Sequence, residues 1–158
     1  MNTEISYCAV DSQMNDAGPA IAQMLLKAIG HERSQKELSV ILDTTKSGTK
    51  IGAIETLLQS SGFATAQKNH ATLHDIMDGL VSGATVVIGY RSEDGTRDHY
   101  AIVKDLTDTE ISLIDPFVGP DVSLSNGAFE SRWHAQDSSD GDHVMMAAYF
   151  PDNVRDIA

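Results

Sequence analysis

The hydrophobic period of this sequence changes near Gly83, and this change constrains the fold more than any other feature. Before that point, apolar residues recur at intervals of three and four, as on one face of a helix. After it, short runs rich in Val, Ile and Tyr alternate with turns of Gly, Asp and Ser, as in strands joined by loops. A helical half followed by a strand half predicts an α+β fold, with N-terminal helices packed on a C-terminal antiparallel sheet.

Four apolar stripes predict helices in the first half: at 19–29, from Ser34, from Ile51 and from Thr72. The second and fourth open with Ser-x-x-Glu and Thr-x-x-Asp, in which the first and last residues can cap each other. The first has Pro at its start and Gly after its end, as helix termini favour. The segment 16–18 then forms the turn that leads into it.

Four runs predict strands in the second half: 85–90, 99–104, 110–115 and 143–150. A short helix is expected at 128–134, a polar loop at 137–142 and a loose tail at 152–158. The 158 residues fit one domain, 1–158, without a disulfide or structural metal.

Charge and cysteine content restrict the partners and the compartment. The net charge of -12 opposes binding to nucleic acid or to an anionic membrane, because both need clustered Lys and Arg. A protein or peptide ligand is therefore expected. The single cysteine, Cys8, fits a reducing compartment, and we expect a cytoplasmic protein. The sequence shows no secretion signal. It also has no apolar run near the ~18 residues of a membrane span, so no membrane anchor is expected.

Residues that can carry chemistry occur at three distant places. Gln13 and Asp16-Ala17-Gly18-Pro19 stand at the start of the first expected helix. His99 opens one expected strand, and Asp115 closes the next. Because helices packed against a sheet leave a cleft between them, the start of this helix and the strand residues can meet there.

These residues resemble the papain-like cysteine peptidases that remove double-glycine leaders from bacteriocins. In that family a Gln precedes Asp-Cys-Gly-Pro, and the order along the chain is nucleophile, histidine, aspartate. The resemblance spans nearly the whole chain and implies a papain-like cysteine peptidase fold without a cofactor or catalytic metal. It implies that position 17 is the nucleophile, that His99 is its base, that Asp115 orients His99 and that Gln13 donates to the oxyanion. Gln13 lies four positions before residue 17, whereas papain-like relatives suggest six.

Each implied role has a physical basis. A thiol becomes a good nucleophile when it is deprotonated, and a helix N-terminus and a neighbouring imidazolium both stabilise the thiolate. A carboxylate that accepts a hydrogen bond from the imidazole fixes its tautomer, and an amide donor stabilises the tetrahedral intermediate.

Position 17 departs from this pattern, because it is alanine. A methyl group cannot attack a carbonyl, so the chain as written is expected to be inactive as a peptidase. We interpret Ala17 as an engineered Cys-to-Ala substitution, since Gln13, Asp16, His99 and Asp115 all remain. The alternative is a naturally degenerate module, like the peptidase-like domains of haemolysin exporters, which binds Gly-rich segments without cutting them.

The predicted function is cleavage of proteins after Gly-Gly. We expect a freestanding, toxin-like effector that a dedicated secretion system delivers into a rival or host cell, because such cargo needs no cleavable signal. It would act there on cytoplasmic proteins, and its producer would need an immunity protein that inhibits it. A transglutaminase or acyltransferase also uses Cys, His and Asp in this order, but the residues around position 17 argue against it.

Other candidate sites have simpler explanations. His70 and His74 have the spacing of a helical zinc pair, but a cap at Thr72 places His70 outside the helix. The acidic stretch with Asp137, Asp140 and Asp142 lacks the Glu and the spacing of a calcium-binding EF-hand loop. Cys8 precedes every expected helix and has no activating neighbour in the sequence.

Overall fold

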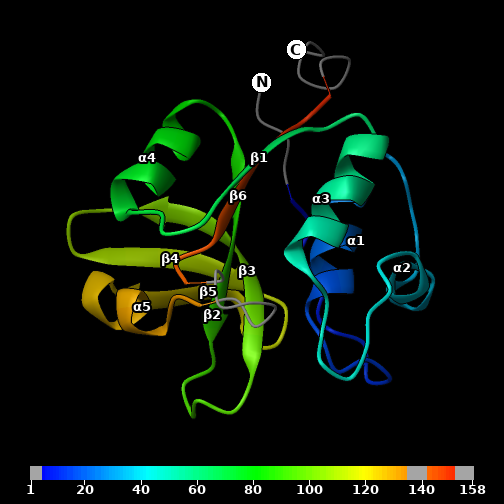
Figure 1. Cartoon of the computed structure of the whole chain (residues 1–158), viewed down its shortest axis with the longest axis horizontal. Helices are drawn as coiled ribbons and strands as arrows, with labels where there is room; N and C mark the ends of the chain where they lie inside the picture. The colour runs from blue at the N-terminus through cyan, green and yellow to red at the C-terminus, as the bar shows by residue number, and fades with distance from the viewer. Residues whose placement is uncertain (1–4, 135–141, 152–158) are drawn as a thin grey trace.

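The computed structural model describes residues 5–134 and 142–151. Helices α1, α2 and α3 lie together at one side of the molecule, and the strands lie at the other side with α4 and α5 (Figure 1). The helices are α1 Gly18–Ala28, α2 Gln35–Ile41, α3 Ile51–Ser60, α4 Leu73–Val81 and α5 Asn126–Arg132. The strands are β1 Ala64–Lys68, β2 Thr85–Arg91, β3 Asp98–Leu106, β4 Glu110–Asp115, β5 Gly119–Ser125 and β6 Met145–Tyr149.

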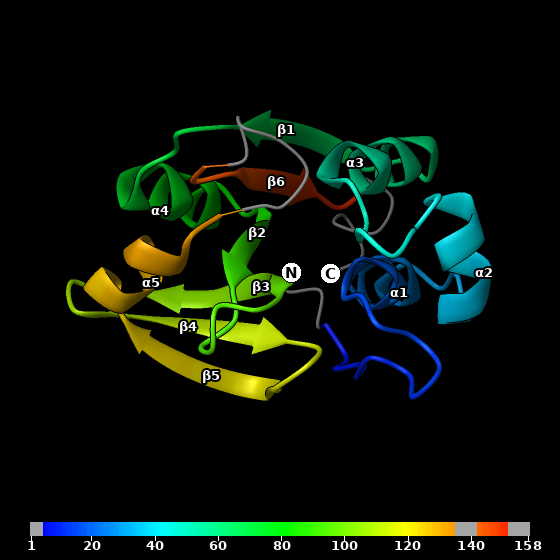
Figure 2. The same cartoon turned by 60° about the horizontal axis from the view of Figure 1, so that its bottom comes forward.

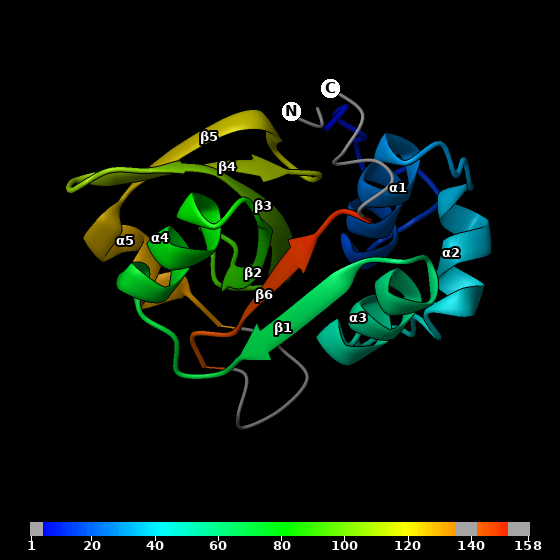
Figure 3. The same ribbon diagram turned by 90° about the horizontal axis from the view of Figure 1, so that it is seen from above.

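The strands form one six-stranded sheet in the order β1-β6-β2-β3-β4-β5, and every neighbouring pair is antiparallel. The predicted α+β class and antiparallel sheet are therefore confirmed. Figure 2 shows the three N-terminal helices grouped beside this sheet, and Figure 3 shows the sheet curving around α4 and α5.

Two hydrophobic clusters hold the layers together, one on each face of the sheet. Strand β3 contributes to both, because successive side chains of a strand point to opposite faces. Tyr100 and Ile102 pack in the cluster that contains the buried residues of α1 and α3, whereas Ala101 and Val103 pack in the cluster with α4 and α5. Strand β3 therefore packs against the N-terminal helices on one face and against α4 and α5 on the other.

The helix starts follow the predicted chemistry. Both capping boxes are present: Ser34 and Thr72 each accept a bond from the backbone of the third residue, whose carboxylate accepts one in return. Helix α5 begins and ends two residues earlier than expected, because the Ser125 side chain accepts a hydrogen bond from the backbone N–H of Ala128 and caps the helix there.

Two strands were not predicted from the sequence, β1 and β5. Both are edge strands, and most of their residues are exposed or half-buried. An edge strand is held mainly by backbone hydrogen bonds to one neighbour, so it needs no alternating apolar pattern. The expected loop at 137–142 and the tail at 152–158 fall, apart from Asp142, outside the described residues. Within the described part of the chain, no helix has the length and apolar character needed to cross a bilayer.

Candidate active site

The start of α1 is fixed by the buried carboxylate of Asp16. Its Oδ2 accepts a hydrogen bond from the backbone N–H of Gly18 at 2.8 Å and another from the Thr49 hydroxyl at 2.6 Å. The first bond satisfies one of the N–H groups that a helix leaves unpaired in its first turn. The second ties α1 to the loop before α3.

The same loop is attached to the sheet. The Tyr100 hydroxyl on β3 donates to the backbone carbonyl of Thr49 at 2.6 Å, and this bond is buried. Thr49 thus contacts α1 through its side chain and β3 through its backbone. The two halves of the molecule are therefore joined by hydrogen bonds directly beside residue 17.

On the sheet side, His99 and Asp115 form a buried pair. Nδ1 of His99 lies 2.8 Å from Oδ2 of Asp115, and the Asp115 side chain is completely buried. Oδ1 of the same carboxylate accepts the backbone N–H of Phe117 at 2.8 Å. Because a carboxylate accepts hydrogen bonds, the proton of the pair lies on Nδ1, which leaves Nε2 free of this bond.

Tyr90 is a third member of this group that sequence reasoning missed. Its hydroxyl also donates to Oδ2 of Asp115. Burial, followed by the nearby charge of Asp115, raises the pKa of Tyr90 above its usual value, so the hydroxyl keeps its proton. The strand register identifies Tyr90 as a member of this group, because Tyr90 on β2 stands directly opposite His99 on β3.

Phe117 covers the outer side of the histidine. The two rings lie 4.6 Å apart at an angle of 30°, and the guanidinium carbon of Arg97 lies 4.8 Å from the centre of the Phe117 ring. An aromatic ring on this side shields the hydrogen bond between His99 and Asp115 from water. His99 itself is 8% exposed.

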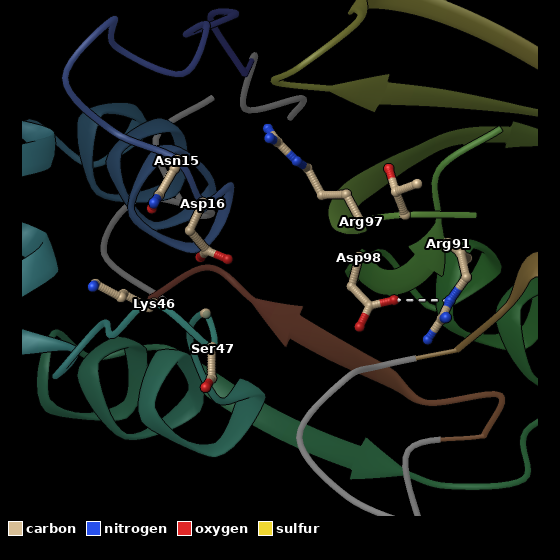
Figure 4. Close-up of a pocket in the computed structure, with 9 residues that line it drawn as sticks. Asn15, Asp16, Lys46, Ser47, Arg91, Arg97 and Asp98 are labelled. Carbon is tan, nitrogen blue, oxygen red and sulfur yellow. Dashed lines mark ion pairs between the residues drawn. The ribbon is translucent and has the colours of Figure 1, made fainter. Parts of the chain in front are cut away.

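A cavity of about 260 Å³ lies between the two halves, next to this pair. Its wall on the helical side comes from the segment before α1 and the loop before α3, and its wall on the sheet side comes from β2, the turn after it and the start of β3. Figure 4 shows Asn15 and Asp16 facing Arg97 and Asp98 across it. Asp98 forms an ion pair with Arg91 at 3.3 Å. The lining residues are Asn15, Asp16, Lys46, Ser47, Gly48, Arg91, Thr96, Arg97 and Asp98.

The predicted site residues have different surroundings. His99 and Asp115 are in direct contact. Asp98, which precedes His99 in the chain, shares the cavity with Asp16, which precedes Ala17. Ala17 is fully buried in the cluster that also contains Tyr100. Gln13 is exposed, in the turn before α1. The oxyanion role expected of Gln13 stays a prediction.

The other candidate residues are described in part. His70 lies before the first residue of α4, and His74 is exposed on that helix. Within residues 5–134 and 142–151, no group of three His, Cys, Asp or Glu side chains could hold a metal ion. Asp137 and Asp140 fall outside the described residues.

The fold has counterparts among known proteins. A family model described as the Peptidase C39 family matches residues 6–136. The peptidase domain of Streptococcus ComA, a bi-functional ABC transporter involved in a quorum sensing pathway, superposes with a TM-score of 0.69 at 19% identity, covering 95% of this chain and 99% of that domain. A double glycine motif protease from an AMS/PCAT transporter, solved in complex with the leader peptide, gives 0.66 at 11% identity, with 93% and 92% covered. The peptidase domain of Streptococcus mutans ComA gives 0.63 at 16% identity, with 92% and 100% covered. No curated protein matches the chain.

Proposed function

Because the chain belongs to the Peptidase C39 family, we propose that its cavity binds an extended protein segment at a pair of glycines. The observation that carries the proposal is the buried contact of 2.8 Å between His99 and Asp115, beside a cavity whose opposite wall contains Asp16. Ser47 and Gly48 line that wall with little side-chain bulk. Backbone without side chains fits beside such a wall, and a Gly-Gly pair supplies that.

In the active form that we propose, cysteine stands at position 17. Its thiolate attacks the carbonyl carbon of the second glycine, and the amide N–H of Gln13's side chain stabilises the oxyanion. His99 gives a proton to the leaving nitrogen as the C–N bond breaks, and water then hydrolyses the thioester with His99 as the base. Asp115 holds the ring of His99 in the productive tautomer.

The chain as written lacks the sulfur for this reaction. Ala17 is fully buried and offers only a methyl group, so we propose that this form binds Gly-Gly segments without cutting them. The same observation favours the second candidate function, a natural binding module that no longer cuts. The two candidates differ in what restoration of a thiol would do.

The roles of a delivered toxin, an immunity protein that inhibits it and a cytoplasmic target in another cell stay predictions from the sequence. The cavity and the His99 pair are the features that an experiment can address directly.

The test uses Ala17→Cys in a Cys8→Ser background, so that one thiol is present. A synthetic peptide with a single Gly-Gly pair is incubated with this variant and with the parent chain, and the products are identified by mass spectrometry. We expect the variant to cut after the second glycine and the parent chain to bind the peptide, by fluorescence anisotropy, without cutting it.

The matched control is the same variant with His99→Ala, checked for folding by circular dichroism. It should lose turnover, because Tyr90, the other side chain that is hydrogen-bonded to Asp115, keeps its proton and cannot replace the imidazole. Cutting by the chain that keeps Ala17, or full turnover without His99, would overturn the assignment. Binding in all forms with no turnover after Ala17→Cys would favour the binding module.

A further inference from the structure

A second, open cavity of about 540 Å³ lies against the turn between β2 and β3. It shares Thr96 and Arg97 with the cavity of the proposed site, so the two cavities adjoin at this turn. His99 lines only the second of them. The remaining lining residues are Ser92, Glu93, Asp94, Phe117 and Val118.

The side of this cavity that faces away from the turn is apolar. Phe117 is half-buried against His99, whereas Val118 is 66% exposed and is one of four large hydrophobic side chains at the surface of the described residues. Leaving such a side chain in water forfeits the free energy of its burial. An apolar group that occupied this cavity would cover Val118 and the edge of Phe117.

The chemistry of the proposed reaction says which part of a substrate lies here. A general acid must be within hydrogen-bond reach of the nitrogen that it protonates, so the leaving nitrogen lies beside His99. The side chain attached to that nitrogen belongs to the residue after the two glycines. The glycines themselves then lie on the side of Asp16 and Asp98, in the smaller cavity.

We propose that the pocket of Phe117, Val118 and the 92–97 turn binds the residue that follows Gly-Gly and selects an apolar side chain at that position. The inference rests on the proposed function and adds its specificity. It predicts that a Gly-Gly pair followed by Leu or Phe is preferred over the same pair followed by Ser, Asp or Lys.

The rim of this pocket adds discrimination against acidic residues. Asp94 accepts hydrogen bonds from the Thr96 hydroxyl and backbone and from the Ser92 hydroxyl. These bonds, those from Thr96 first, lower the pKa of Asp94 to about 2, so it is ionised at neutral pH. Glu93 adds a second carboxylate, while Arg97 lies against Phe117. An Asp after the glycines would meet two like charges.

The experiment measures binding to the chain with Ala17, in which no turnover interferes. Fluorescent peptides that are identical except for Leu, Ser, Asp or Lys after Gly-Gly are titrated by anisotropy. We expect the Leu peptide to bind about tenfold more tightly than the Ser peptide, because a difference of one apolar side chain in a pocket changes affinity by about this factor. The Asp peptide should bind more weakly than the Ser peptide.

Val118→Ser should bring the Leu and Ser peptides to within about twofold of each other, because the apolar wall is lost. The matched control is Val81→Ser, since Val81 on α4 is 78% exposed and lines neither cavity. It should leave the Leu preference unchanged. Both substitutions are at the surface, so both variants should fold.

The outcomes separate the two proposals. If no peptide binds, the proposed function fails, and the inference falls with it. If the peptides bind with equal affinity, or if Val81→Ser and Val118→Ser change the preference for Leu alike, the proposed function stands. The assignment of this pocket to the residue after Gly-Gly is then wrong. A preference for Lys that Glu93→Gln removes would also overturn it, because the carboxylate rim would then be the selecting feature.

Discussion

Nδ1 of His99 and Oδ2 of Asp115 lie 2.8 Å apart, in a contact from which water is excluded because Asp115 is completely buried. The carboxylate of Asp115 accepts hydrogen bonds from His99, Tyr90 and the backbone of Phe117. A buried charged group is tolerated when it is paired and hydrogen-bonded in this way. The pair is therefore both the centre of the proposed chemistry and a structural element.

Asp115→Ala should destabilise the fold by about 3 kcal/mol, because it leaves the buried donors of Tyr90 and His99 without their acceptor. Urea unfolding followed by circular dichroism measures this free energy. The control is Asp121→Ala, because the Asp121 side chain is 79% exposed in its ion pair with Lys104, and a surface change of this kind costs at most about 0.5 kcal/mol. Equal effects of the two substitutions would contradict the structural role of Asp115.

Tyr90→Phe should change how the stability of the fold depends on alkaline pH. The folded protein raises the pKa of Tyr90 above 10.0, its value in the unfolded chain, because the side chain is buried beside Asp115. A raised pKa gives stability that is complete below the unfolded value and is lost as the pH rises beyond it. Between about pH 9 and pH 11, the parent chain should therefore lose unfolding free energy more steeply than Tyr90→Phe. Tyr149→Phe, at an exposed hydrogen bond with Ser82, serves as the control and should follow the parent slope.

The sequence predicts the elements whose signals are local. The capped helices from Ser34 and Thr72 are in place because a capping box involves residues only three positions apart. The contact of His99 with Asp115 could be predicted from motif order, because adjacent antiparallel strands bring their ends together. Tyr90 could not, because its role depends on the register of β2 against β3.

The edge strands and the hydrogen bonds through Thr49 show a second limit of prediction from the sequence. Strand β5 contains Pro120 and Asp121 and has little buried surface, so its residues do not form a strand pattern. Thr49 joins Asp16 to Tyr100, which lie 33 residues before and 51 residues after it. Such contacts are fixed by packing between distant segments, and no periodicity within one segment encodes them.

Gly18→Ala should destabilise the protein through a steric conflict at the start of α1. An added Cβ would lie 2.5 Å from both Cβ and Oγ1 of Thr49, closer than real side chains approach. Moving Thr49 would strain its bonds with Asp16 and Tyr100, so we expect a loss of about 1–3 kcal/mol in unfolding free energy. Gly52→Ala in α3 is the matched control, since nothing lies within 4 Å of the added atom. It should stabilise by about 0.5–1 kcal/mol, and a Gly18→Ala variant as stable as the parent would contradict the packing.

The reactivity of a thiol at position 17 should differ from that of Cys8. Burial raises the pKa of Cys8, with a smaller opposing effect from Lys27, so iodoacetamide should modify the parent chain at a rate that rises only toward and above pH 9.0. In Ala17→Cys with Cys8→Ser, the thiol stands at the N-terminus of α1 and faces, in the proposed site, the imidazole of His99. Both features favour the thiolate and oppose the effect of burial at this fully buried position, so its alkylation should already proceed at about pH 7. Mass spectrometry over a pH series measures both rates.

The control adds His99→Ala, which should move the alkylation of the new thiol to higher pH. A pH profile that matches that of Cys8, or that does not change when His99 is lost, would mean that position 17 does not face the histidine.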